Sequence, residues 1–288
     1  MGERLEVALR TGSLLGEGPT WDQRSDRLLW VDILAAEIHS FDPATGQDGV
    51  LRTRQHVGAA KPRAGGGLVA NLRDGIGLYD PDGSFRWLAD LAVEGRRGND
   101  AAVDSSGHLW AGTMRYDESA GGGRLYRVAP GGEVTTVLDR VTVSNGTGWS
   151  PDGRRMYYVD SPTRRVDVFD VDPGTGLVAG RRTFLELGGA PGFPDGLTVD
   201  ADGCLWVAFW DGGVVRRFTP TGRPDRRVEV PASRTTACAF GGADLRDLYI
   251  TTATAGLDAG QLATQPLAGS LFVLADAGPG LASPPFAG

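Results

Sequence analysis

The sequence predicts an all-β protein, and within that class a six-bladed β-propeller. Short apolar runs alternate with turn dipeptides throughout the chain, whose 288 residues include 44 glycines and 17 prolines. This alternation of apolar runs and turns is typical of many short strands, and no long stretch has the apolar period of a helix. A phrase of about 40 to 50 residues also recurs, which is the size of one propeller blade.

The repeated phrase begins with one short strand, turns, and continues into a second strand that carries a large side chain. The clearest copy has Asp195 at a corner, a first strand through Leu197, a turn at residues 200–203 and a second strand from Leu205. Equivalent positions in the second strands are Trp30, Trp110, Tyr158, Trp206 and Ile250. The six copies are expected to begin at Glu17, Gly65, Asn99, Asn145, Asp195 and Thr235. Two tandem β-sandwiches are the competing fold, but they would not explain a constant repeat.

A lone strand precedes the first copy, and the last copy ends short. The lone strand spans Leu5 to Leu9. Because a propeller ring must close, we expect this strand to complete the last blade. Small sheets of this kind bury their faces only against one another, so residues 1–288 are expected to form a single β-propeller domain.

Composition excludes several classes of protein. The formal net charge is −7, and the arginines are mixed with acidic residues, which argues against a nucleic-acid-binding surface. No apolar run is long enough to span a membrane, and the N-terminal residues lack the apolar core of a signal peptide. We therefore expect a cytoplasmic protein. Cys204 and Cys238 are expected to be buried strand thiols rather than a disulfide.

Polar residues occur at the same phase of several copies, just before the first strand. In a propeller the first strands line the central channel, so these side chains should gather at one mouth of it. They are Glu17, Asn99 with Asp100, Asn145 and Asp195, whereas the second copy offers Arg63 or a glycine and the sixth Thr235. Carboxylate and amide oxygens favour a divalent cation, with Ca²⁺ the first expectation and Zn²⁺, Mn²⁺ or Mg²⁺ the alternatives. Zinc is less favoured because His39, His56 and His108 lie outside this phase.

A purely structural interpretation competes with this one. Asn145-Gly146 and Asp195-Gly196 are also strong turn dipeptides, and either alone would predict a turn without a function. Glu17 is a poor turn former, and its shared phase with the other two favours a site.

Several phrases resemble the regucalcin (senescence marker protein)/gluconolactonase family. The similarity runs from about residue 14 to the C-terminus, and it is carried by residues 15–21, 97–100, 110–114, 144–146, 194–196, 205–208 and 235–242. The resemblance implies a six-bladed propeller and a metal-dependent sugar lactonase. It places the metal on Glu17, Asn145 and Asp195 and substrate contacts on Arg97 and Asn99. It also implies an acidic substrate contact, which would be Asp117 or Glu118.

These residues suggest metal-dependent hydrolysis of sugar (aldono-)lactones, such as gluconolactone or a pentonolactone, to the aldonic acid. Asp195 is the candidate catalytic base. The chain has no Gly-x-Ser-x-Gly elbow, so a covalent serine mechanism is not expected. The alternatives are an ester or organophosphate hydrolase on the same propeller and a non-catalytic calcium-binding propeller. The expected partner is a small-molecule sugar lactone, with no nucleic acid or membrane, and the chain is expected to be a monomer or a weak homodimer.

Overall fold

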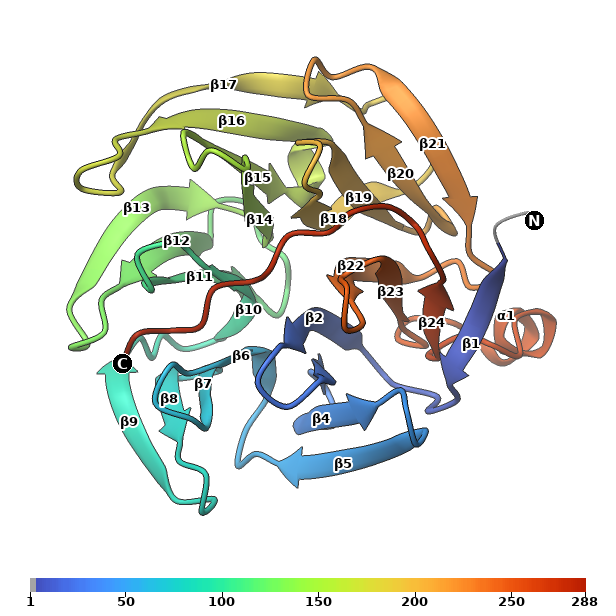
Figure 1. Cartoon of the computed structure of the whole chain (residues 1–288), viewed down its shortest axis with the longest axis horizontal. Coiled ribbons are helices and arrows are strands. Elements are labelled where there is room, and N and C mark those ends of the chain that lie inside the picture. The colour runs from blue at the N-terminus through green and yellow to red at the C-terminus, as the bar shows by residue number, and fades with distance from the viewer. Residues whose placement is uncertain (1–3) are drawn as a thin grey trace.

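The computed structural model describes residues 4–288 and has six four-stranded antiparallel sheets arranged in a ring (Figure 1). Blade 1 contains β2 (Gly16–Asp22), β3 (Arg27–Asp32), β4 (Glu37–Asp42) and β5 (Gln47–Arg52), and blade 2 contains β6 (Val57–Pro62), β7 (Leu68–Leu72), β8 (Gly75–Tyr79) and β9 (Phe85–Asp90). Blade 3 contains β10 (Arg96–Val103), β11 (Leu109–Arg115), β12 (Gly123–Val128) and β13 (Val134–Val141), and blade 4 contains β14 (Ser144–Trp149), β15 (Arg155–Asp160), β16 (Arg165–Val171) and β17 (Val178–Glu186). Blade 5 contains β18 (Phe193–Val199), β19 (Leu205–Trp210), β20 (Val214–Phe218) and β21 (Pro224–Glu229). Blade 6 contains β22 (Thr235–Gly241), β23 (Asp247–Thr252), β24 (Leu271–Leu274) and β1 (Leu5–Leu9). A 3₁₀ turn (Ser161–Thr163) and the short helix α1 (Ala259–Thr264) complete the described part.

The N-terminal strand closes the ring as predicted. β1 pairs antiparallel with β24, with Leu5 opposite Leu274 and Val7 opposite Phe272. Leu5 and Val7 also pack against the apolar core between blades 5 and 6. The six-bladed propeller is therefore confirmed. The first three residues of the predicted domain lie outside the described part.

Second-strand aromatics hold neighbouring blades together. Trp30, Trp110, Tyr158 and Trp206 are each at most 1% exposed, as is Ile250 at the sixth position. The Trp206 ring meets Phe240 of the next blade edge to face at a centroid distance of 5.8 Å. Full burial of a large apolar side chain contributes about 1.5–3 kcal/mol, so these side chains stabilise the interfaces between blades 6 and 1, blades 3 and 4, and blades 5 and 6. Both cysteines are buried free thiols, with Cys238 in β22 and Cys204 just before β19.

The second blade begins earlier than the repeat suggested. Its first strand is β6, whereas residues 65–67 form the turn between β6 and β7. Gly67 is required in this turn because its φ is +75° and a Cβ there would lie 2.1 Å from the Tyr79 carbonyl oxygen. Arg63 thus lies just beyond the end of β6, away from the predicted site. Its Nε donates to the Gly288 carbonyl over 2.8 Å.

Residues 275–288, which we call the tail, cross one mouth of the channel from β24 toward blades 2 and 3 (Figure 1). Phe286 is fully buried among apolar residues of those two blades. Its backbone N–H donates to the Pro62 carbonyl over 2.8 Å, and that of Ala287 donates to Gly107 over 3.0 Å. The tail therefore covers what we call the tail mouth. Among residues 4–288, no helix has the length and apolar character needed to cross a membrane.

Candidate functional site

Every first strand carries an irregularity at the same level of the channel. The register between first and second strands shifts between Glu17 and Thr20, Val57 and Ala59, Gly98 and Ala101, Ser144 and Thr147, Pro194 and Leu197, and Thr235 and Ala237. A β-bulge inserts an extra residue and re-aims the side chains around it. The bulges thus explain how polar residues of the first strands come to face the channel.

Asn145 and Asp195 lie in these bulges and not in hairpin turns. Asn145 is the second residue of β14, and Asp195 is the third residue of β18 rather than a corner before it. Gly146 permits the close approach of the two strands, because a Cβ there would lie 2.6 Å from the Leu197 nitrogen. The turn interpretation of both dipeptides is therefore wrong.

Glu17, Asn99, Asn145 and Asp195 meet at the mouth opposite the tail, which we call the site mouth. The prediction is wrong for Asp100, which lines a separate cavity on the tail side. A cavity of about 190 Å³ lies at the site mouth, and its lining includes Glu17, Arg97, Asn99, Glu118, Asn145, Ser161, Phe193, Asp195 and Trp210. Blades 2 and 6 contribute no charged side chain to the lining of this cavity. Gly58 occupies the bulge of blade 2, and Thr236, not Thr235, occupies the bulge of blade 6. Thr236 Oγ1 donates to the Gly16 carbonyl over 2.6 Å and so ties blade 6 to blade 1.

Glu118 and Asp117 are placed differently. Glu118 lines the cavity and has a left-handed backbone with φ of +52°. Asp117 is 61% exposed, contacts Arg115 over 3.2 Å, and accepts from the Ser119 backbone N–H over 3.1 Å. Asp117 therefore organises the rim loop, and Glu118 is the acidic group that reaches the cavity.

A chain of hydrogen bonds runs along the cavity wall. Arg97 Nη1 donates to Asn99 Oδ1 over 2.7 Å, and Asn99 Nδ2 donates to Asn145 Oδ1 over 2.8 Å. Asn145 Nδ2 then donates to Ser161 Oγ over 2.8 Å. Ser161 follows the second strand of blade 4, and no pattern in the sequence marks it. The chain fixes the side-chain orientation of both asparagines.

The two buried carboxylates repel each other. Burial, followed by the charge of Asp100, raises the pKa of Glu17 to about 8. Burial and then the charge of Glu17 raise the pKa of Asp195 well above its usual value. Asp195 Oδ1 is also a buried atom without a hydrogen-bond partner. A buried oxygen of this kind is costly unless something pairs with it.

A divalent cation fits this arrangement. Glu17, Asp195 and Asn145 offer the hard oxygen atoms that Ca²⁺ and similar ions prefer. Among residues 4–288 no three His, Cys, Asp or Glu side chains are grouped as metal ligands, so the third ligand would be the amide oxygen of Asn145. The cavity lining carries three carboxylates and one guanidinium, and a divalent cation would balance that charge.

The fold and site define a six-bladed propeller with an oxygen-lined cavity at one channel mouth. Residues 15–254 match the family model described as SMP-30/Gluconolactonase/LRE-like region, and the chain belongs to that family. It is 38% identical to 6-deoxy-6-sulfogluconolactonase of Pseudomonas putida, over 100% of both chains. It is 39% identical to pentonolactonase of Haloferax volcanii, over 92% of this chain and 91% of that one. A solved structure of regucalcin from Agrobacterium tumefaciens, described as a calcium-binding protein, aligns with a TM-score of 0.94 and 33% identity, over 99% of this chain and 97% of that one.

Proposed function

We propose that this protein is a lactonase that hydrolyses sugar aldonolactones to aldonic acids with the help of one divalent metal ion. The observation that carries the proposal is the unpartnered Oδ1 of Asp195, which lies buried in a cavity with two further carboxylates and an arginine. Two relatives named for lactone hydrolysis, each aligned over more than nine tenths of the chain, support the reaction class. The calcium-binding description of the regucalcin structure supports the metal.

Glu17, Asn145 and Asp195 would hold the ion. When bound, it would supply the Lewis acidity that polarises a lactone carbonyl. Glu17 Oε2 accepts from the Gly18 backbone N–H over 3.1 Å, which orients this carboxylate. Ca²⁺ is the ion that the all-oxygen ligand set favours most, with Zn²⁺, Mn²⁺ or Mg²⁺ as alternatives.

Asp195 is the proposed base. Its carboxylate would take a proton from a water molecule as the water oxygen bonds to the carbonyl carbon. The bond between that carbon and the ring oxygen then breaks, and the proton passes to the ring oxygen. One water is consumed, and one hydroxy acid is formed. Burial and then the charge of Glu17 raise the pKa of Asp195, and a more basic carboxylate is a better proton acceptor.

Three further residues of the lining, Arg97, Asn99 and Glu118, would orient the sugar. Arg97 has donor groups beyond the Nη1 that holds Asn99, and its guanidinium lies beside the Tyr116 ring, 5.9 Å from the centroid. Glu118 can accept hydrogen bonds from sugar hydroxyls across the cavity. With the ion bound, the charges of the cavity lining balance, which favours an uncharged aldonolactone such as gluconolactone or a pentonolactone.

The test is a pH-indicator assay on a panel of aldonolactones with each of the four ions, corrected for spontaneous hydrolysis. We expect turnover that is lost with chelator and restored by an added ion. Absence of turnover across the panel would overturn the proposal in favour of ester hydrolysis or calcium binding alone. A cytoplasmic location and a monomeric or weakly dimeric state remain predictions.

A further inference from the structure

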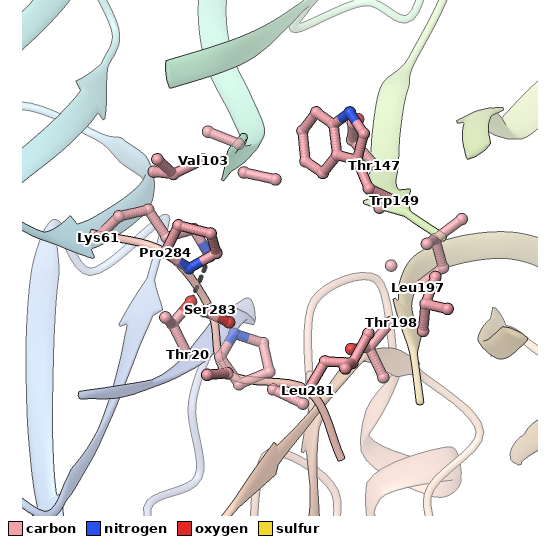
Figure 2. A pocket seen from close by; sticks show the side chains of 18 of the residues that line it. Thr20, Lys61, Val103, Thr147, Trp149, Leu197, Thr198, Leu281, Ser283 and Pro284 are labelled. Carbon is pink, nitrogen blue, oxygen red and sulfur yellow. Dashed lines mark hydrogen bonds between the residues drawn. The ribbon is translucent and has the colours of Figure 1, made fainter. Parts of the chain in front are cut away.

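A second cavity lies in the channel between the candidate site and the tail. We call it the lower chamber; its volume is about 370 Å³, and tail residues 281–284 form one of its walls (Figure 2). Two charged side chains stand along its inner wall, Lys61 of β6 and Asp100 of β10. A third, Asp152, lies at its exposed edge and bonds to Ser150. Burial of an ammonium beside the proposed cation site is costly unless other groups pair with it.

Oxygen atoms hold the Lys61 ammonium. Lys61 is 7% exposed, and its Nζ donates to the Gly18 carbonyl over 3.1 Å. Nζ also donates to Thr20 Oγ1 over 2.5 Å (Figure 2). Among residues 4–288, no ion pair joins Lys61 Nζ to a carboxylate oxygen within 4.0 Å. Burial lowers the pKa of Lys61, and the charges of Asp100 and then Glu17 oppose that decrease at longer range.

Asp100 is the carboxylate whose charge acts most strongly on Lys61. Its Oδ1 accepts from the Ala101 backbone N–H over 2.8 Å, and the side chain borders the chamber. Burial raises the pKa of Asp100, and the Lys61 charge opposes that rise. Asp100 in turn repels both Glu17 and Asp195. Glu17 and Asp195 therefore lie in the cavity of the candidate site, and Asp100 lies in the lower chamber with Lys61.

We propose that the Lys61 ammonium is a built-in cation of the channel, which takes the place of a second metal ion and limits the channel to one. A carbonyl, a hydroxyl and a carboxylate are the donor types that Ca²⁺ binds. Because the Lys61 ammonium is part of the protein, it neutralises Asp100 at every Ca²⁺ concentration. Lys61 also holds the Gly18 carbonyl, next to Glu17, so it positions the bulge that carries this ligand. The inference builds on the metal site of the proposed function.

The test counts Ca²⁺ ions per folded chain by equilibrium dialysis up to millimolar Ca²⁺, together with melting temperatures. We expect one ion for the wild type and two for Lys61→Ser, because the substitution opens space and leaves Asp100 without its cation. Lys61→Arg keeps the charge and should bind one ion. In Lys61→Ser/Asp100→Asn neither charge is present, and the count should return to one, which separates the effect from ions bound at the acidic surface.

A folded Lys61→Ser protein that still binds one ion would overturn the inference, as would a double variant that also binds two. If Lys61→Ser is recovered unfolded even with Ca²⁺, Lys61→Gln takes its place with the same expected count and the same failing result. The proposed function fails separately: a wild type that binds no ion would refute its metal, whereas a rise from zero to one ion in Lys61→Ser would still support a built-in cation.

Discussion

Asn99 donates a hydrogen bond from Nδ2 to Oδ1 of Asn145 over 2.8 Å. The oxygen that accepts this bond is also the one proposed to face the metal, so the substrate contact and the metal ligand belong to one network. The same Nδ2 donates to the Ser144 carbonyl over 2.9 Å, which fixes the amide against β14. A change at Asn99 should therefore reach both functions of the site.

Asn99→Ala is expected to raise KM and also to weaken metal binding. A hydrogen bond of this kind contributes about 1 kcal/mol, so loss of one orienting bond should weaken Ca²⁺ binding about fivefold. Titration calorimetry with Ca²⁺ and steady-state kinetics at saturating Ca²⁺ would separate the two effects. Ser161→Ala is the matched variant, because it removes the partner of Asn145 Nδ2 and leaves Oδ1 in place. An unchanged Ca²⁺ affinity in Asn99→Ala would show that this bond does not position Asn145.

The stability of the metal-free protein should fall as pH rises. Without a cation the pKa of Glu17 is raised to about 8 by burial and the charge of Asp100. A carboxyl with a raised pKa favours the folded state below its unfolded pKa, and that stability is lost as pH increases through the folded value. The melting temperature of chelated protein should therefore decrease between about pH 5 and pH 8.

Ca²⁺ should reverse this loss, since an ion that binds only the folded state stabilises it. The increment in melting temperature should be larger at the upper end of that pH range, where the carboxylates are ionised. Glu17→Gln should show a smaller pH dependence and a smaller Ca²⁺ increment. If Glu17→Gln binds ions as tightly as the wild type, the ligand set is wrong.

The N-terminal strand is expected to be essential for the ring. Deletion of residues 1–10 removes β1 and leaves β24 with an unpaired edge, which promotes aggregation. Light scattering and thermal unfolding of the truncated protein would measure this. A truncated protein with the wild-type melting temperature would rule out a structural role for the closure.

Phe286 is expected to anchor the tail. Phe286→Ala would leave a cavity between blades 2 and 3 at a cost of about 3–5 kcal/mol, and thermal unfolding should show a lower melting temperature. The site mouth lies at the other end of the channel, so KM should stay unchanged below the unfolding transition. A variant with unchanged stability would mean that the tail is not held by this side chain.

The repeat phase located Glu17, Asn99, Asn145 and Asp195 because each stands beside a glycine and ahead of a recognisable strand. Blade 2 lacks that signal, since β6 reads Val-Gly-Ala-Ala-Lys-Pro and has no large alternating side chains. Because the predicted start of blade 2 lay after Lys61, this residue was not among the predicted channel residues. The tail has no periodicity at all, and Phe286 docks more than 170 residues away in sequence on β11, β10 and earlier strands, for example at Leu109 and Val103.

The sharpest test of catalysis concerns Asp195. Asp195→Asn keeps the size and one coordinating oxygen but removes the charge and the basicity, so some metal affinity should survive while proton abstraction is lost. We expect kcat on gluconolactone and pentonolactones to fall at least about a hundredfold at saturating metal, as loss of a general base requires. Initial rates, corrected for spontaneous hydrolysis, and metal binding measured on the same sample would distinguish lost chemistry from a lost ion. Because Asp195 Oδ1 has no partner within the protein, the substitution breaks no hydrogen bond at that atom, and the fold should survive. Turnover near the wild-type rate in metal-loaded Asp195→Asn would overturn the assignment of the base.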